Sequence, residues 1–464
     1  MAHTIGLGAG KNSTGASTGS STRYTIGSAP GRLPLLGHAL PLRRRPLEFL
    51  SELPARGDLV TVHFGRLPAY LVCHPELVRQ VLRDPQTFDK GGPVFDKARL
   101  LIGDGLVTCG RTEHRRQRRL VQPAFHPVRV GTYAQAVVAE TDRATADWQP
   151  GVPLDVGVRM HTLTARVTAR TLFSTDIDEP TMDELAHNLP VVLAGLHQRM
   201  VAPTGFPGRL PTPGNRRFQR ALARLNELID TMIENHRRDP TDRGDLLSAL
   251  LAARDEESGE GLTGHQIHDQ VMTMLSAGTE TTANALAWTL HLVGTHPEAE
   301  VRLHAELDRV LGGSPPRVED LPALAYARRT LTESLRLRSP VWLLTRVTTV
   351  DTELGGRRLR AGSTVAFSPY ALHHDPTLFA DPEVFDPDRW LPERLEEVPR
   401  GAMLPFGGGA RKCVGDSFAL TEATLALARI STRWRLHPQP GRAVRAQPGM
   451  TLGTGPLPML PERR

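Results

Sequence analysis

Residues 406–415 read FGGGARKCVG, with three consecutive glycines, an Arg-Lys pair and a cysteine within ten positions. Cys413 is one of three cysteines in a chain of 464 residues, and the others are Cys73 and Cys109. An odd number of cysteines without a CxxC pair disfavours a disulfide framework and a zinc site made of cysteines. An isolated cysteine is most often a small buried hydrophobic residue, so the rest of the sequence must decide the role of Cys413.

A long helix is predicted over residues 262–294, LTGHQIHDQVMTMLSAGTETTANALAWTLHLVG. Thr263 and Gln266 fit a capping box at its start, and Gly294 with Pro297 fits its end. The face expected to be buried has residues at spacings of three and four, namely Ile267, Val271, Met274, Gly278, Thr281, Ala285 and Trp288.

The centre of this helix, AGTETT at 277–282, has small and polar residues where a core helix normally has large apolar ones. Glycine inside a helix costs about 0.5–1 kcal/mol relative to alanine, and threonine can bond back to the preceding turn and bend the helix. One interpretation is tight helix packing at Gly278. The other is a groove for a flat or small ligand, where Glu280 and Thr281 offer carboxyl and hydroxyl groups for proton delivery.

Two clusters of charged residues have ordinary explanations when each is taken alone. Glu333 and Arg336, in LTESLRLRSP (331–340), have the spacing of a helix ion pair, and Arg389 is a candidate third partner. His114 and Arg118 are four residues apart and can hold one anionic group from the same helix face. A solvated basic face is the alternative, and nucleic-acid binding is disfavoured because no interleaved aromatics or recognition motif accompany them.

Composition indicates a globular chain, with 39% hydrophobic and 23% charged residues. The net charge of +6 is compatible with an acidic protein partner or with nucleic acid and does not choose between them. The sequence has no run of about 18 apolar residues, so no membrane-spanning helix is predicted. The N-terminus does not have the pattern of a secretory signal. A cytoplasmic protein is therefore expected.

Residues 1–28 are rich in Gly, Ser and Thr and are predicted to be a disordered tail. Residues 29–464 are expected to form a single domain. Alternating residues in VTVHF (60–64), followed by AYLVC (69–73), predict a hairpin. Helices are expected between about 74 and 335 and after Cys413, with a second strand region at 341–368. The predicted fold class is mainly α with a small β portion drawn from both ends of the chain.

The combination of these motifs resembles one family. The loop satisfies F-x-x-G-x-R-x-C-x-G through Phe406, Gly409, Arg411, Cys413 and Gly415. With AGTET at 277–281 and ExxR at 333–336 in the expected order, the chain resembles the cytochromes P450, the haem-thiolate monooxygenases, over residues 30–460. The resemblance implies a triangular, mostly helical domain around haem b.

The resemblance also implies a role for each residue of the loop. Cys413 would be the axial thiolate on the haem iron, a ligation that favours O–O cleavage. Because a buried thiolate needs hydrogen-bond donors, the glycine turn would direct backbone N–H groups at the sulfur, with Gly409 at positive φ. Phe406 would shield the sulfur from water and Arg411 would pair with a haem propionate. Gly415 would let the next helix approach the porphyrin.

Further roles follow from the same resemblance. Propionate binding is implied for His114, Arg118 and Arg346, and a buried structural triad for Glu333, Arg336 and Arg389. Glu280 and Thr281 would govern proton delivery to iron-bound dioxygen. Electrons from NAD(P)H would arrive through a separate ferredoxin and ferredoxin reductase, with Lys412 near the docking site. A monomer is expected, without nucleic-acid or membrane partners.

The substrate wall is expected at 88–110, 195–213, the centre of the long helix and 340–344, with contacts from Ala277, Gly278, Val341 and Leu343. The segment 340–344 reads PVWLL and is apolar, and residues 195–218 hold few carboxylates and several apolar residues. A neutral, hydrocarbon-like substrate is therefore predicted. Stretches such as PGRLPLLGH and TFDKGGP look similar to bacterial sesquiterpene oxidases. That resemblance implies oxidation of a sesquiterpene such as pentalenene, from methyl to alcohol to aldehyde, in antibiotic or terpenoid biosynthesis.

Three alternatives remain open at this point. The substrate can be another secondary metabolite or a fatty acid. A haem enzyme that uses peroxide would not need the acid-alcohol pair of AGTET. A non-catalytic haem protein would leave the apolar segments without a role, and no DNA-binding or signalling module accompanies them.

Overall fold

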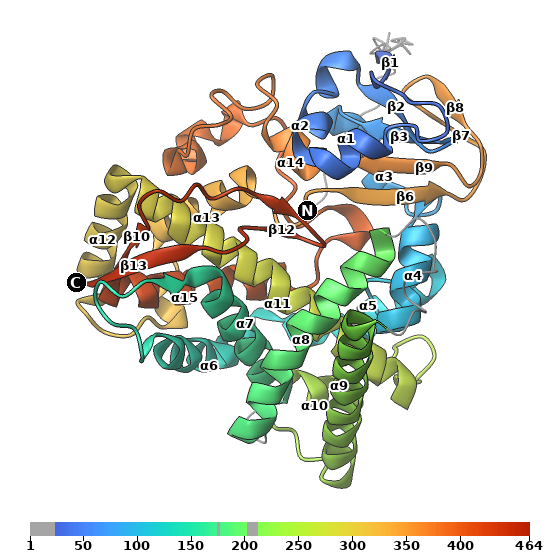
Figure 1. The fold of residues 1–464 in the computed structure, drawn as a ribbon. Helices are drawn as coiled ribbons and strands as arrows, with labels where there is room; N and C mark the ends of the chain where they lie inside the picture. The colour runs from blue at the N-terminus through green and yellow to red at the C-terminus, as the bar shows by residue number, and fades with distance from the viewer. Residues whose placement is uncertain (1–23, 174–176, 202–211) are drawn as a thin grey trace, which may run out of the picture.

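The computed structural model describes residues 24–173, 177–201 and 212–464 (Figure 1). Its α-helices are α1 (Ala39–Arg44), α2 (Pro46–Ser51), α3 (Pro75–Arg83), α4 (Pro93–Ile102), α5 (Arg111–Val121), α6 (Pro127–Thr145), α7 (Val156–Phe173), α8 (Glu179–Val201), α9 (Pro213–Arg238), α10 (Leu246–Ala252), α11 (Gly264–Thr295), α12 (Pro297–Leu311), α13 (Ala325–Leu337), α14 (Pro369–His373) and α15 (Asp416–Arg433).

The strands are shorter and come mainly from the two ends of the chain. They are β1 (Ile26–Ser28), β2 (Leu59–Phe64), β3 (Leu67–Val72), β4 (Phe88–Asp89), β5 (Leu154–Asp155), β6 (Leu344–Thr348), β7 (Thr352–Leu354), β8 (Arg357–Leu359), β9 (Thr364–Phe367), β10 (Trp434–Pro438), β11 (Gln447–Pro448), β12 (Leu452–Gly453) and β13 (Pro458–Arg463). This confirms the mainly α class with a small β portion.

The largest sheet joins the N-terminal hairpin to strands from the second half of the chain. Its order is β1-β2-β3-β9-β6-β4. β2 and β3 pair antiparallel, with Leu59 opposite Val72, so the hairpin prediction is confirmed. β3 then pairs parallel with β9, with Tyr70 opposite Val365. Figure 1 shows this sheet in one corner of the molecule, at the upper right.

The predicted boundary of the N-terminal tail needs one correction. Residues 26–28 were expected in the disordered tail, but they form β1, which pairs parallel with β2 so that Ile26 lies opposite Leu59. Thr25 also contributes, because its backbone N–H donates to Asp58 at 2.7 Å. These backbone bonds extend the sheet further toward the N-terminus than the glycine-rich composition suggested. The rest of the predicted tail, residues 1–23, lies outside the described residues.

α11 crosses the middle of the molecule (Figure 1). The predicted capping box is present, since the Thr263 hydroxyl accepts from the backbone of Gln266 and the Gln266 side chain accepts from the backbone of Thr263. Most residues of the helix are buried, because α7, α13 and α15 pack against it. Its centre therefore lies deep in the molecule, where a ligand on its open side would be shielded from bulk water.

Two large apolar clusters contain the two halves of α11. One includes Leu286 and Leu290 of α11 with Leu425 of α15, and the other includes Val271 and Leu275 of α11 with residues from α7 to α10. Within the described residues, no helix is both long enough and apolar enough to cross a membrane. The clusters leave the middle of α11 as the boundary between two packed halves.

Candidate active site

The cysteine loop is held by a tight backbone turn against α3. Gly409 has φ +63°, as the sequence predicted, and a Cβ at this position would lie 1.9 Å from the Leu82 carbonyl oxygen. Only glycine fits there, because a side chain would face both strain and a clash with backbone. The backbone N–H of Cys413 donates to the Phe406 carbonyl at 3.0 Å, which closes the loop.

The thiol of Cys413 is exposed, whereas Cys73 and Cys109 are buried. The surrounding protein nevertheless raises the pKa of Cys413 by desolvation, while a hydrogen bond from the backbone N–H of Gly415 lowers it. Partial desolvation and one backbone donor thus act in opposite directions on the pKa of this thiol. A thiol that is both exposed and partly desolvated lies in a recess and is open to a ligand.

The neighbours of Cys413 differ in how well they match their predicted roles. Gly415 supplies the hydrogen bond to sulfur, but its missing Cβ faces Phe125, whose ring carbon lies 3.4 Å away. Phe406 is half-buried and packs against the core that contains α15. Its role as a water shield over the sulfur remains a prediction. Cys73 and Cys109 are buried side chains, as their sequence surroundings indicated.

Five basic side chains gather beside the cysteine loop, and the positive charge of Arg411 lowers the pKa of three of them. Burial and the charge of Arg411 lower the pKa of Arg346 to about 10. Burial and the charges of Arg411, Lys90 and Arg118 lower the pKa of His114 to about 3. Burial and the charges of Arg346 and Arg411 lower the pKa of Lys90 to about 7. Such mutual repulsion marks a site that an anion would stabilise.

The groups that bind the arginines of this basic cluster come from three parts of the chain. Arg411 pairs with Asp89 at 2.6 Å and donates to the Cys109 carbonyl at 2.9 Å. The Arg118 guanidinium donates to the Lys412 carbonyl and so ties α5 to the cysteine loop. Asp89 is thus the carboxylate that partly balances the cluster, and it sits in β4 next to Lys90. The predicted propionate residues His114, Arg118, Arg346 and Arg411 do lie together.

Lys90 and Asp89 were missed by the sequence reasoning. Both residues lie in the segment 88–110 that was expected to form a substrate wall, and nothing in the spacing of TFDKGGP links them to residues more than 200 positions away. The signal that existed was rarity, since Lys90 is one of only four lysines in the chain. The fold makes the link, because β4 pairs with β6, and Asp89 lies opposite Val347 next to Arg346.

The donor set fits haem. An exposed thiol offers one soft ligand for iron, and the adjacent basic cluster offers donors for two carboxylates. Among residues 24–173, 177–201 and 212–464, no group of three or more His, Cys, Asp or Glu side chains is arranged to hold a metal ion. A single cysteine beside a basic cluster therefore suits a metal carried by an anionic macrocycle.

The centre of α11 opens on one side, although the helix around it is buried. Ala277 is exposed and Gly278, Glu280 and Thr281 are half-buried, whereas Ser276 and Thr282 on either side are buried. The Thr281 hydroxyl donates to the Ala277 carbonyl at 2.6 Å, which leaves its oxygen as an acceptor. The structure thus brings the predicted acid-alcohol pair to an open face.

The side-chain position of Gly278 faces α7 and not the opening where a substrate contact was expected. A Cβ built on it would point at Thr168 of α7, at an ordinary contact distance of 3.4 Å. Tight packing is therefore not what requires glycine here, and the groove interpretation is favoured over it. A side chain at 278 would meet α7, so the substrate contact expected for Gly278 is better assigned to the exposed Ala277.

The C-terminal hairpin of β11 and β12 is a wall that the sequence reasoning missed. The Thr451 hydroxyl donates to Glu280 Oε1 at 2.6 Å, and Asn284 Nδ2 donates to Thr451 at 2.7 Å. The hairpin also reaches the segment 340–344, because Trp342 Nε1 donates to the Gly449 carbonyl at 3.1 Å. The predicted contacts Val341 and Leu343, both half-buried, lie in this segment.

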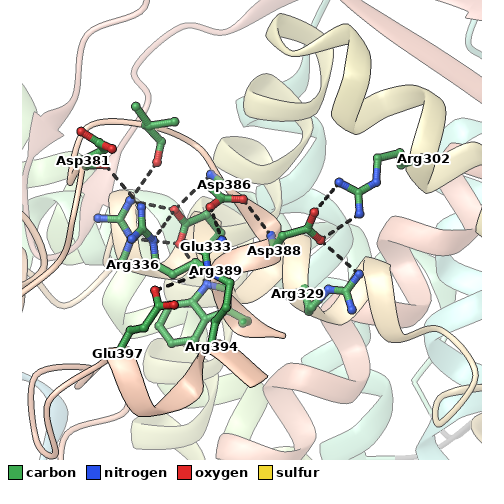
Figure 2. Close-up of polar contacts among 12 residues, drawn as sticks. Arg302, Arg329, Glu333, Arg336, Asp381, Asp386, Asp388, Arg389, Arg394 and Glu397 are labelled. Carbon is green, nitrogen blue, oxygen red and sulfur yellow. Dashed lines mark hydrogen bonds and ion pairs between the residues drawn. The ribbon is translucent and has the colours of Figure 1, made fainter. Parts of the chain in front are cut away.

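The predicted triad is buried and connected (Figure 2). Glu333 accepts two bonds from Arg336, at 2.8 and 2.9 Å, and one from Arg389 at 3.4 Å. Glu333 and Arg336 are fully buried and Arg389 is 4% exposed. Trp390 donates to the same carboxylate at 2.9 Å. The three charged groups are out of water and Trp390 is half-buried, so the network holds α13 and the 385–393 segment together.

A buried histidine connects this triad to the cysteine loop. His373 Nδ1 lies 3.1 Å from the Arg336 carbonyl, and its Nε2 accepts the backbone N–H of Leu404 at 3.0 Å. Burial lowers the pKa of His373 to about 3, so the ring is neutral and Nδ1 carries the proton. Leu404 lies two residues before Phe406, and the histidine therefore fixes the entry of the cysteine loop.

Comparisons with known proteins agree with this geometry. The sequence matches the family Cytochrome P450 over residues 28–460. It is 55% identical to cyclooctatin synthase of Streptomyces melanosporofaciens over 95% of this chain and 96% of that protein. It is also 55% identical to cyclooctat-9-en-7-ol 5-monooxygenase of the same organism, over 95% and 96% of the two chains.

Pentalenene oxygenase of Streptomyces avermitilis is 47% identical over 91% of this chain and 94% of that protein. Among solved structures, the cytochrome P450DA heme domain superposes with a TM-score of 0.81 at 28% identity, covering 95% of this chain and 98% of that one. The family match, the long relatives and the superposition agree over nearly the whole chain. The chain belongs to the cytochrome P450 family and is a haem-dependent monooxygenase, with a cysteine thiolate as iron ligand and O₂ as co-substrate.

Proposed function

We propose that this monooxygenase hydroxylates a neutral, polycyclic terpenoid substrate. The observation that carries the proposal is the identity of 47–55% over more than nine-tenths of the chain to relatives named for cyclooctatin, cyclooctat-9-en-7-ol and pentalenene. The sequence had suggested pentalenene, but the two relatives at 55% identity carry cyclooctatin names. The proposed class therefore includes alkenes and alkenols.

The side chains near the open face of α11 support an apolar substrate. Ala277 presents a methyl group, and the segment 340–344 and the hairpin present Val341, Trp342 and Met450 as half-buried apolar side chains. Burial of apolar surface contributes about 25 cal/mol per Å², so such walls favour hydrocarbon skeletons. Glu280 is engaged by Thr451, which leaves it a poor partner for a charged substrate group.

The residues of the site have these roles in the proposal. Cys413 holds the haem iron, while Lys90, His114, Arg118, Arg346 and Arg411 neutralise the two propionates. Haem, when bound, supplies activation of O₂ and transfer of one oxygen atom to the substrate. Glu280 and Thr281 hold and pass protons at the open face of α11. Val341, Leu343 and Ala277 exclude water and orient the substrate.

A binding and turnover experiment tests the substrate class. The reduced system is incubated separately with cyclooctat-9-en-7-ol, with pentalenene and with a long-chain fatty acid, and spectral shifts and products are recorded. We expect a substrate-induced shift and a hydroxylated product with at least one of the two terpenoids, and neither with the fatty acid. Turnover of the fatty acid alone would overturn the terpenoid proposal.

We further propose that a separate acidic ferredoxin, reduced by a ferredoxin reductase with NAD(P)H, delivers electrons in the cytoplasm. Arg83 and Lys412 are exposed, and α3 touches the cysteine loop where Leu82 meets Gly409. Opposite charges across such an interface mainly raise the association rate. An acidic surface would therefore approach the side of the molecule on which Cys413 lies.

Charge reversal tests this docking face. Arg83→Glu should raise the KM for a reduced ferredoxin several-fold, while reduction by dithionite stays unchanged. The same reversal at Arg220, an exposed residue of α9, is the matched control and should leave the KM unchanged. Equal effects of both substitutions would show that net charge, and not this face, governs the encounter.

A further inference from the structure

The acid of the AGTET motif is held by a residue from the far end of the chain. The Thr451 hydroxyl donates to Glu280 Oε1 at 2.6 Å, across 171 positions of sequence. Asn284, one turn after Glu280 on α11, donates from Nδ2 to the Thr451 oxygen at 2.7 Å. Three side chains from two elements therefore form one hydrogen-bonded chain that ends on the carboxylate.

The direction of these bonds is fixed by the chemistry of the groups. A hydroxyl has a single proton, and Asn284 Nδ2 donates to the oxygen of Thr451 because an amide nitrogen cannot accept. The proton of Thr451 therefore points to Glu280, whose Oε1 is an acceptor. Hydrogen bonds to a carboxylate are about twice as strong as neutral ones, so this contact strongly favours one orientation of Glu280.

Burial and backbone contacts keep Thr451 in place. Thr451 is 7% exposed and Asn284 is 4% exposed, so neither exchanges freely with water. The hairpin is pinned on both sides of the site, since Trp288 Nε1 donates to the Leu452 carbonyl at 3.0 Å and Leu452 N–H donates to the Pro340 carbonyl at 2.9 Å. These bonds fix the backbone beside Thr451, and the bonds to Asn284 and Glu280 fix its hydroxyl.

Two histidines on neighbouring helices lie within the electrostatic influence of this carboxylate. His161 of α7 has its pKa lowered by burial and raised by Glu280, by a hydrogen bond with Asn284 and by Asp155. His197 of α8 has its pKa lowered by burial and raised by Glu280. The net lowering of their pKa leaves both rings neutral near pH 7. Neither ring is therefore a charged partner for Glu280, and the Thr451 hydroxyl remains its hydrogen-bond donor.

We propose that Thr451, oriented by Asn284, is a positioning residue for proton delivery. Its hydroxyl fixes Glu280 Oε1 as an acceptor and leaves Oε2 to exchange protons near Thr281. The inference rests on the proposed role of Glu280 and Thr281 and extends it to a residue outside the motif. Thr451 acts through Glu280 and does not itself carry the proton.

An isosteric substitution tests the proposal in the holoenzyme. Thr451→Val keeps the shape and removes the hydroxyl, and we expect the fraction of NADPH electrons recovered in product to fall about threefold or more, with little change in KM. Thr451→Ser restores the hydroxyl and should restore coupling. Thr454→Val is the matched control, because Thr454 is equally buried and its hydroxyl donates to the Gly455 carbonyl at 2.8 Å.

A double-mutant cycle shows whether Thr451 acts through Glu280. In a Glu280→Ala background, Thr451→Val should cause no further loss of coupling. A crystal structure of Thr451→Val gives a readout apart from activity, and we expect the Glu280 carboxylate turned away from the hairpin. If Thr451→Val does not fold, Asn284→Leu removes the orienting donor from α11 and should reduce coupling in the same direction.

The outcomes separate this inference from the function on which it rests. Unchanged coupling in Thr451→Val, with Glu280 in its original position, would overturn the positioning role while Glu280→Ala remains uncoupled. Unchanged coupling in both Glu280→Ala and Thr281→Ala would overturn the proposed acid-alcohol pair itself. Full additivity of Thr451→Val and Glu280→Ala would show that Thr451 acts by another route.

Discussion

At the scale of single residues, Glu333 is the acid that joins the two arginines of the triad. Its carboxylate accepts from Arg336, Arg389 and Trp390 and from the backbone N–H of Asp386, while it is itself fully buried. Arg336 also donates to backbone carbonyls of the 373–384 segment. The ion pair that looked ordinary in sequence thus supports a region of irregular backbone.

We predict that Glu333→Gln lowers the free energy of unfolding by about 3–5 kcal/mol, because it leaves two buried guanidinium groups without their shared carboxylate. Denaturant unfolding of the holoenzyme measures the change. Glu396→Gln, at an exposed position, is the control and should change stability by less than about 0.5 kcal/mol. A loss at Glu333 no larger than the control's would show that the triad does not stabilise the fold.

We predict that Arg346→Leu speeds haem loss about tenfold or more. Arg346 is 3% exposed and lies in a cluster of like charges, and a charge-assisted hydrogen bond contributes about 1.5–3 kcal/mol. Transfer of haem to an acceptor apoprotein measures the rate. Arg358→Leu, on the exposed face of β8, is the control. Equal haem retention in the two variants would contradict propionate binding by the cluster.

Among the site residues, those with a local motif were predictable and those without one were not. Gly409 follows from its place in the cysteine motif, and its positive φ agrees with the prediction. Thr451 and Lys90 have no such signature, because their importance depends on strand pairing and hairpin placement across long sequence separations.

At the scale of elements, α11 was predicted nearly to its ends. The capping box set its start at Gly264, and its end at Thr295 lies one residue beyond the predicted 294. The open centre was one of two interpretations, and the exposed Ala277 beside the half-buried Glu280 and Thr281 favours the groove. The hairpin of β11 and β12 was not predicted, because each of its strands is only two residues long.

We predict that Thr281→Ala uncouples NADPH consumption from product formation, because the open face of α11 loses the hydroxyl beside Glu280. The ratio of product to NADPH consumed should fall several-fold, and Thr281→Ser should recover most of it. Thr289→Ala is the matched control, because Thr289 makes the same bond to the preceding turn, at 2.7 Å, at a buried position. Unchanged coupling in Thr281→Ala would favour the peroxide-dependent alternative.

At the scale of the whole molecule, buried histidines link stability to pH. Burial, with nearby positive charges, lowers the pKa of His304 to about 4 and that of His373 to about 3. The ordinary value is about 6.5, so the unfolded chain takes up protons in a range where the folded chain does not. The histidines therefore cost no stability above pH 6.5, and stability is lost as the pH falls toward 4.

We predict that His304→Leu reduces the slope of the free energy of unfolding against pH. The reduction corresponds to one proton, or about 1.4 kcal/mol per pH unit, between about pH 6 and 4.5. Denaturant unfolding at several pH values measures the slope. The same substitution at the exposed His187 is the control. A slope that does not change in His304→Leu would contradict a neutral buried His304 in the folded state.

The fold class of the whole molecule was predictable because three motifs in one order point to the same architecture. What the sequence did not predict is where each end of the chain packs. β1 extends the sheet into residues assigned to the tail, and the C-terminal hairpin closes over α11. Both depend on backbone pairing, which composition and local spacing do not reveal.

The central claim is that Cys413, as a thiolate, is the protein ligand of haem iron, and one spectrum tests it most directly. The reduced, CO-bound holoenzyme should show the red-shifted Soret band of thiolate ligation, and Cys413→Ser should lose the shift while it still binds haem in the basic cluster. A folded, haem-loaded wild-type protein whose reduced CO complex lacks the shifted band at neutral pH would contradict the account.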